Sequence, residues 1–156
     1  MKKIVFVEDS RSFRALVRKE IERFLKKHQV AAEITDLASE SEAIEYFNNP
    51  SHAIADFVLV DLALIWSAAP DQGPEPEWVI QAGIHDAGYR VIKVIQAQER
   101  WKACKIVIYS SRGVDEVPKK LKEYELEEVE AIPKEDKAEP LLIRIQELFG
   151  LSKHQT

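Results

Sequence analysis

The sequence predicts an α/β protein built on a doubly wound, five-stranded parallel sheet. Short apolar runs that favour strands alternate along the chain with segments whose apolar residues recur at helical spacing. The strand-like runs are almost continuously apolar, as in FVLV at 57–60, which is typical of parallel strands buried on both faces. Right-handed crossovers then place helices on both sides of the sheet.

The first half of the chain supplies two strands and two helices of this pattern. A first strand at 4–7 stops at Glu8 and Asp9, and apolar residues spaced by three and four over 13–25 predict a helix capped by Asp9 or Ser10. A second strand is expected at 32–37. The sequence SESE at 39–42 is a capping box, which predicts a helix from there to Phe47.

The second half supplies three strands and three helices. We expect strands at 56–62, 105–109 and 129–132, and helices at 89–101, 117–124 and 140–149. Pro118 and Pro140 lie in the first turns of the last two helices, where proline is tolerated. Five strands alternating with five helices favour one domain over 1–150, followed by a frayed tail at 151–156.

Polar residues gather where the predicted strands end. Strand one ends at Glu8 and Asp9, strand three at Asp61, strand four at Ser110 and strand five at Lys134. Each residue alone has an ordinary explanation, such as a helix cap or a surface lysine. Because the carboxyl ends of parallel strands share one edge of the sheet, where ligands bind in such folds, we expect all five side chains to meet there.

These residue types suit phosphoryl transfer. Three neighbouring carboxylates repel one another unless a cation lies among them, and Mg²⁺ prefers oxygen ligands of this kind. One carboxylate is then free to act as a nucleophile towards phosphorus. The lysine and the metal neutralise the phosphoryl oxygens, and the serine hydroxyl donates a hydrogen bond to one of them.

The motifs IVFVEDS, FVLVDLAL, IVIYSSRG and AIPKED, in this order, resemble the receiver domain of bacterial response regulators, in particular stand-alone, chemotaxis-regulator-like receivers. The resemblance covers nearly the whole chain and implies a (βα)5 flavodoxin-like fold with strand order 2-1-3-4-5. It also implies roles for single residues. Asp61 is the phosphoacceptor, Asp9 and Asp61 are direct Mg²⁺ ligands, Glu8 assists through water, and the Ala63 carbonyl is a further ligand. Ser110 and Lys134 take the places of the phosphate-contacting residues.

The resemblance implies a function in two-component signal transduction. A sensor histidine kinase or a phosphotransfer protein would phosphorylate Asp61 in a Mg²⁺-dependent reaction, and output would pass to a downstream protein by direct contact. Such a protein catalyses only its own phosphorylation and dephosphorylation and is otherwise not an enzyme. Two alternatives stay open: a phosphorylation-independent scaffold that binds partners through 62–87, and an aspartate-nucleophile phosphohydrolase. The second is disfavoured because EDSR at 8–11 lacks an Asp-x-Asp arrangement.

The segment 62–87 departs from the receiver pattern. Connections in such folds usually run about two to six residues, whereas this 26-residue segment holds two tryptophans, three prolines and four acidic residues, without lysine or arginine: Trp66, Trp78, Pro70, Pro74, Pro76, Asp71, Glu75, Glu77 and Asp86. We expect either a lid over Asp61 or a docking surface anchored by the tryptophans; the alternative is a surface excursion whose tryptophans pack back on the sheet. A second departure is Ala131, which stands where receivers often carry the Tyr or Phe that relays phosphorylation.

Charge and targeting signals narrow the class of protein. The net charge of −5 argues against a nucleic-acid partner, which needs a concentrated basic face. The single cysteine, Cys104, cannot form an internal disulfide and is expected to be a small buried residue. The apolar run after Lys3 is too short for a signal peptide or a membrane span, so we expect a cytoplasmic protein with no membrane insertion.

Overall fold

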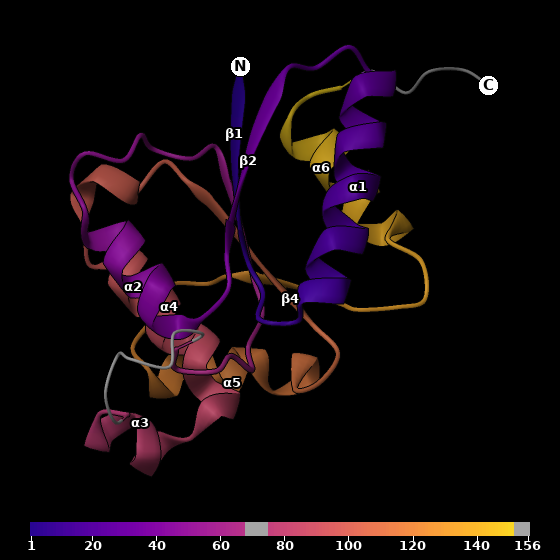
Figure 1. Ribbon diagram of the computed structural model, residues 1–156. Helices are drawn as coiled ribbons and strands as arrows, with labels where there is room; N and C mark the ends of the chain where they lie inside the picture. Colours follow the sequence, from indigo (N-terminus) through magenta and orange to yellow (C-terminus); the bar gives the residue numbers. More distant parts are fainter. Residues whose placement is uncertain (68–74, 152–156) are drawn as a thin grey trace.

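The computed structural model describes residues 1–67 and 75–151, and its centre is one parallel sheet (Figure 1). The strands are paired in the order β2-β1-β3-β4-β5. Their bounds are β1 Lys2–Val7, β2 Ala32–Leu37, β3 Phe57–Val60, β4 Lys105–Ser110 and β5 Glu130–Pro133. The predicted fold class and strand order are confirmed.

The described residues form six α-helices and three short 3₁₀ helices. The α-helices are α1 Arg11–Lys27, α2 Glu40–Asn48, α3 Glu77–Ala82, α4 Ala87–Gln96, α5 Val117–Glu123 and α6 Glu139–Leu148, and the 3₁₀ helices are η1 Ile84–Asp86, η2 Glu99–Trp101 and η3 Val114–Glu116. Both predicted side-chain caps are present, since Ser10 and Ser39 accept from the backbone amides of Phe13 and Glu42. The helix expected over 89–101 ends at Gln96, and its last residues form η2 instead.

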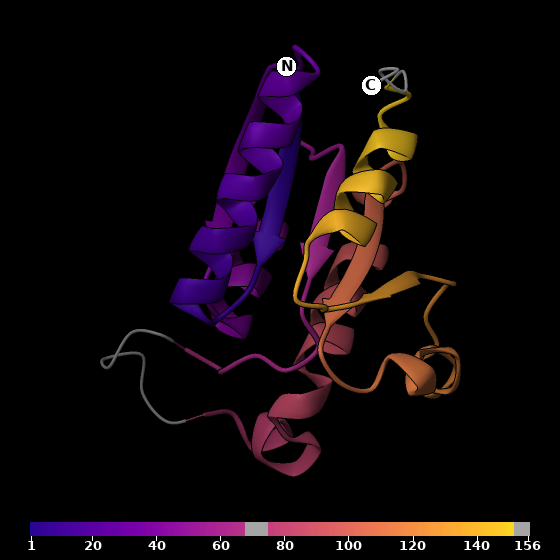
Figure 2. The same ribbon diagram turned by 90° about the vertical axis from the view of Figure 1, so that its right-hand side faces the viewer.

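Helices cover both faces of the sheet (Figures 1 and 2). On one face α1 and α6 pack on the side chains of Ile4, Phe6 and Leu59. On the other face α2, α4 and α5 pack on Val5 and Val58, among other apolar side chains. Successive strand residues thus enter opposite cores, as the near-continuous apolar strands predicted. Cys104 is buried as expected, and burial raises the pKa of its thiol to about 12.

The third strand is shorter than the predicted 56–62. Before the strand, the Asp56 carboxylate accepts the backbone N–H of Lys3 at 2.8 Å, which fixes the chain as it enters the sheet. After Val60, the Asp61 amide still donates to the Val7 carbonyl at 3.0 Å, but its carboxylate accepts the next amide, that of Leu62, at 2.7 Å. This local bond turns the chain out of the sheet, so Asp61 lies just beyond the strand end.

The segment 62–87 is more structured than the predicted loop, because it contains α3 and η1. Its first part lies on the start of α2, where the carbonyls of Ile65 and Trp66 accept the amides of Glu40 and Ser41 at 2.9 and 2.8 Å. A six-residue helix preceded by prolines carries too little periodicity to be seen in a sequence. Pro70, Asp71 and Pro74 of this segment, like 152–156 of the expected frayed tail, lie outside the described residues. Among the helices that the structure describes, none is both long and apolar enough to cross a bilayer.

Candidate functional site

Four strand ends bring the predicted site residues to one edge of the sheet. The parallel register aligns Val7 with Val60 and Val60 with Ile108, and it pairs Ser110 with Pro133. Glu8 and Asp9 directly follow β1, Asp61 follows β3, Ser110 ends β4 and Lys134 follows β5. β2 lies on one side of the β1–β3 pair, and β4 and β5 lie on the other. The strand order therefore reverses between β1 and β3, and the site lies at this topological switch point of the sheet.

Three carboxylates converge at this edge. Glu8, Asp9 and Asp61 each offer one oxygen, and these three atoms lie within 4.8 Å of one another. Glu8 is 1% exposed and Asp61 is 7% exposed, while Asp9 is half-buried. Carboxylates held this close and this far from water repel one another strongly unless cations compensate them.

Lys134 supplies one such cation. Its ammonium donates to Asp61 Oδ2 at 2.8 Å and to Glu8 Oε2 at 2.5 Å. It also lies 4.4 Å from the ring centroid of Phe13, and its backbone amide donates to the Ser110 carbonyl at 2.9 Å. The lysine is therefore fixed by both ends, on the same end of the molecule as Asp61.

The pKa values of this group follow from burial and charge together. Burial raises the pKa of Glu8, because it disfavours the charged carboxylate more than the hydrogen bond from Lys134 favours it. Burial also acts to lower the pKa of Lys134, but its hydrogen bonds and charge attraction to Asp61 and Glu8 outweigh that effect, so the pKa is raised. The lysine stays charged, and burial makes ionisation of Glu8 harder than it is in water.

Each of the three carboxylates also accepts one backbone amide. Glu8 Oε1 accepts the amide of Ser10 at 2.9 Å, and Asp61 Oδ1 accepts that of Leu62. Asp9 Oδ2 accepts the amide of Ile65, in the segment 62–87, at 3.0 Å. These bonds orient the carboxylates and tie Asp9 to the start of the inserted segment.

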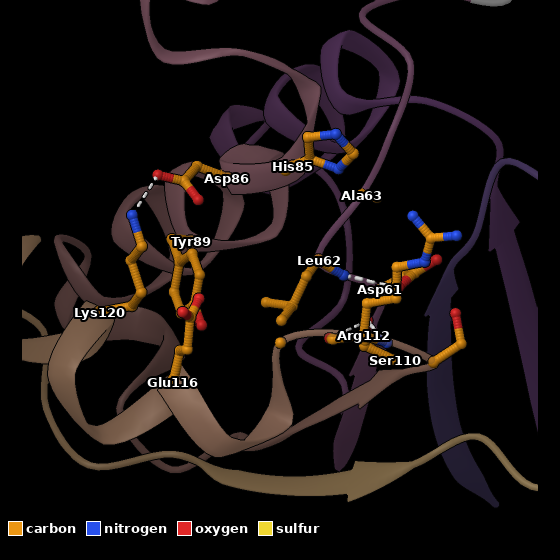
Figure 3. A pocket seen from close by; sticks show the side chains of 12 residues that line it. Asp61, Leu62, Ala63, His85, Asp86, Tyr89, Ser110, Arg112, Glu116 and Lys120 are labelled. Carbon is orange, nitrogen blue, oxygen red and sulfur yellow. Dashed lines mark hydrogen bonds and ion pairs between the residues drawn. The ribbon is translucent and has the colours of Figure 1, made fainter.

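Ser110 and Ala63 line a cavity of about 500 Å³ that also has Asp61 in its wall (Figure 3). Ser110 is 3% exposed, and its hydroxyl donates to the carbonyl of Arg112 at 3.0 Å. Since a hydroxyl has one proton to donate, Ser110 must give up that bond to reach a group on Asp61. The opposite wall comes from the segment 85–89 and from α5, where Lys120 pairs with Asp86 at 3.1 Å.

Gly88 allows α4 to begin directly against the site. Its amide donates to the Leu62 carbonyl at 2.8 Å, and a Cβ at this position would lie 2.3 Å from the Asp61 carbonyl oxygen and 2.7 Å from the Leu62 Cα. No side chain fits at such distances without a backbone shift. Gly88 thus sets how closely α4 approaches the residue that follows β3.

The donor set fits a divalent cation. When the three carboxylates are ionised, Lys134 compensates only one of their charges. Oxygen ligands from two strand ends, with an uncompensated double negative charge, are the chemistry that Mg²⁺ or Mn²⁺ selects. Glu8, Asp9 and Asp61 are the residues that would hold the metal.

A buried ion pair beside the site was not predicted. Arg90 of α4 binds Glu40 of α2 through two hydrogen bonds, at 2.6 and 2.9 Å, and Glu40 is fully buried. Glu40 was interpreted only as part of a capping box, and nothing in the sequence links it to a residue 50 positions away. This pair joins α4, which follows the inserted segment, to α2, on whose start that segment lies.

Position 131 of β5, where receivers often carry Tyr or Phe, is an alanine in this sequence. Ala131 packs on the α2–α4–α5 face, whereas Tyr109 is buried on the opposite face, with its ring 5.9 Å from that of Phe13. Tyr109 therefore does not replace the missing residue. On the Ala131 face the stacked rings of Tyr89 and Tyr124 lie 5.5 Å apart.

Comparison with known proteins reveals similarity at the level of structure only. No protein-family profile and no curated protein matches the sequence. Among solved structures, the Mn²⁺-bound form of the response regulator Rcp1 is 17% identical with a TM-score of 0.62, and the match covers 99% of this chain and 98% of Rcp1. The receiver domain of the merR DNA-binding response regulator from Colwellia psychrerythraea 34H is 14% identical with a TM-score of 0.65, covering 96% and 99%. The non-phosphorylated HemR receiver domain from Leptospira biflexa is 22% identical with a TM-score of 0.58, and both chains are covered completely. The chain therefore has the fold of response-regulator receiver domains.

Proposed function

We propose that this protein is a receiver of two-component signal transduction, phosphorylated on Asp61 by a histidine kinase or a phosphotransfer protein. One observation carries the proposal: the Asp61 carboxylate lies beside two further acids and is held at 2.8 Å by the ammonium of Lys134, whose side chain is 12% exposed. A nucleophilic carboxylate and a fixed positive charge beside it are the groups that phosphoryl transfer needs. We also propose that the protein acts in the cytoplasm, where such kinases present their phosphoryl groups.

In the proposed reaction a carboxylate oxygen of Asp61 attacks phosphorus and forms an O–P bond. The P–N bond of the donor phosphohistidine breaks, and its electron pair returns to the imidazole nitrogen. Lys134 stabilises the charge that develops on the phosphoryl oxygens, and Ser110 exchanges its bond to the Arg112 carbonyl for one to a phosphoryl oxygen.

A divalent metal is the proposed cofactor, held by Glu8, Asp9 and Asp61, with the Ala63 carbonyl as a further ligand. When bound, it neutralises charge on the carboxylates and on the transferred group. The similar response regulator Rcp1 is known in a Mn²⁺-bound form, and the proposal extends a divalent ion, Mg²⁺ in the cell, to this chain. The protein turns over no separate substrate: Asp61 is regenerated only when its own acyl phosphate is hydrolysed.

Acetyl phosphate, a small acyl-phosphate donor, tests the proposal. We expect intact-mass measurement to detect one added phosphoryl group in the presence of Mg²⁺ and none after chelation of the metal. Asp61→Asn should abolish labelling. The matched control is Asp56→Asn, which changes the aspartate at the other end of the same strand and should leave labelling intact.

The same experiment separates the two alternative functions. Continuous release of phosphate from many phosphate esters, without a stable labelled state, would favour a phosphohydrolase. Unmodified protein under every condition would favour a phosphorylation-independent scaffold. Either result would contradict the receiver proposal.

A further inference from the structure

Exposed apolar side chains concentrate on the inserted segment. Among the described residues, eight large hydrophobic side chains are exposed, and four of them come from the segment 62–87; we call this group the apolar patch: Ile65 (41% exposed), Trp78 (45%), Ile80 (65%) and Ile84 (43%). The other four are spread over the start of the chain, α1, α6 and the connection before β3. Half of the exposed hydrophobic side chains thus come from a short stretch of the chain.

The elements that carry the apolar patch are in contact with one another. The indoles of Trp66 and Trp78 pack edge to face with centroids 5.4 Å apart, and the Leu64 amide donates to the Ile84 carbonyl at 3.2 Å. α3 and η1 project beyond the carboxyl edge of the sheet, below α2 and α4 in the view of Figure 1, and η1 leads directly into α4 (Figures 1 and 2). Trp66 and Trp78 pack on each other, and Ile80 is exposed to solvent.

The patch is held on a rigid base. The guanidinium carbon of Arg90 lies 5.6 Å from the centroid of the Trp78 ring, and the buried Glu40 fixes Arg90. Ile65 is held on both sides, since Asp9 accepts its amide and the Glu40 amide donates to its carbonyl. A preorganised apolar surface loses little conformational entropy on binding, which favours affinity.

The charge of the segment selects the partner. Residues 62–87 contain no lysine or arginine, and of their acids Asp86 already pairs with Lys120, so the described acids left near the patch are Glu75 and Glu77. Glu75 and Glu77 are exposed and precede Trp78 by three positions and by one. A second copy of the chain would bring like charges together, whereas a basic partner would be attracted and correctly oriented.

We infer that the apolar patch docks an amphipathic helix of a partner protein, whose apolar face is bordered by lysine or arginine. Exposed apolar surface with charged neighbours marks interaction sites, and an exposed aromatic residue such as Trp78 is a common anchor. The inference goes beyond the proposed function and does not depend on it, because none of its residues is the phosphoacceptor.

A designed peptide probe tests the inference. The probe is a fluorescein-labelled Leu/Lys peptide of about 18 residues, long enough to be helical when bound, with its leucines on one helical face. Two peptides serve as references: one with the same composition in alternating order, and one with glutamate in place of lysine. Fluorescence anisotropy with the full chain should give saturable binding for the amphipathic basic peptide, weakened by salt.

Matched variants locate the binding surface. The double variant Ile80→Ser/Ile84→Ser should weaken binding about tenfold or more, as expected for truncation at an interface centre. The double variant Leu16→Ser/Ile143→Ser, which removes exposed hydrophobic side chains from α1 and α6, should bind like the wild type. Circular dichroism of both variants checks that they fold. Asp61→Asn should bind the peptide with wild-type affinity. The binding test therefore stays valid even if the phosphorylation proposal fails.

Several outcomes would overturn the inference. They are absence of binding by the basic peptide, equal binding of the acidic peptide, and unchanged affinity of the Ile80→Ser/Ile84→Ser variant. Concentration-dependent dimers that this variant abolishes would instead assign the patch to a second copy of the chain.

Discussion

Lys134 holds its ammonium between Asp61 and Glu8, and its surroundings are poor in water. The ammonium compensates the negative charge of the ionised carboxylates. It also lies where a phosphoryl group on Asp61 would need positive charge. A single side chain therefore connects the stability of the resting protein with the proposed chemistry.

Lys134→Met removes that charge and leaves the buried Glu8 without its cation. We expect the free energy of unfolding to fall by about 3 kcal/mol near pH 8, as when one partner of a buried ion pair is lost. The pKa of Glu8 is already raised by burial, and a group with a higher pKa in the folded state destabilises that state as pH rises. The deficit should therefore shrink towards pH 5.

Urea unfolding at both pH values measures this prediction. The control is Lys137→Met, the same substitution at an exposed position of the following loop, which should be nearly neutral. An equal effect of the two substitutions would show that the Lys134 ammonium is not a structural charge.

At the level of elements, the start of α4 and the end of β3 form one structural unit around Gly88. Sequence periodicity placed a helix here, and the sequence also placed Asp61 at a strand end. The close approach between them, however, depends on tertiary geometry that no local pattern contains.

Gly88→Ala should displace the backbone of Asp61 and Leu62, because the new Cβ would overlap both. We expect a loss of about 1–3 kcal/mol of stability, typical of overpacking, and a large drop in phosphorylation rate. Gly83→Ala is the matched control: it places a methyl group in open space at φ +79°, so it costs only backbone strain and leaves the site unchanged. Phosphorylation that is equally fast in both variants would contradict this role for Gly88.

Glu40 and Arg90 join α2 to α4 through a buried charge pair. Arg90→Met should cost about 3–5 kcal/mol, because it leaves the Glu40 carboxylate buried and unpaired. The double variant Glu40→Leu/Arg90→Met should recover most of that loss, since no charge is then left behind. Thermal unfolding of the three proteins tests this, and a double variant less stable than Arg90→Met would contradict it.

At the scale of the whole molecule, the parallel sheet and its two helical layers could be predicted because the apolar strands and the helical spacing agree over almost the entire chain, whereas the strand order was implied by the resemblance to receiver domains. The convergence of Glu8, Asp9, Asp61, Ser110 and Lys134 followed from that topology alone. The helix α3 and the Glu40–Arg90 pair could not be predicted, because one is too short for periodicity and the other joins residues distant in sequence.

Metal binding should stabilise the entire fold. An ion that binds only the folded protein adds about 2.7 kcal/mol at a concentration one hundred times its Kd. We expect Mg²⁺ to raise the Tm of the wild type and to have little effect on Asp9→Asn, in which the side-chain oxygen can still accept the Ile65 amide. Asp136→Asn, at an exposed acid outside the site, is the control and should respond like the wild type.

The central claim is that the side chains at four strand ends form one site that accepts a phosphoryl group on Asp61. Borohydride reduction of the phosphorylated protein, followed by peptide mass spectrometry, tests it most directly, because reduction converts an aspartyl phosphate into homoserine at the modified position. The account predicts a Mg²⁺-dependent homoserine at position 61 and at no other aspartate. Reduction at a different residue, or a phosphoryl group that survives on a histidine or a serine, would contradict it.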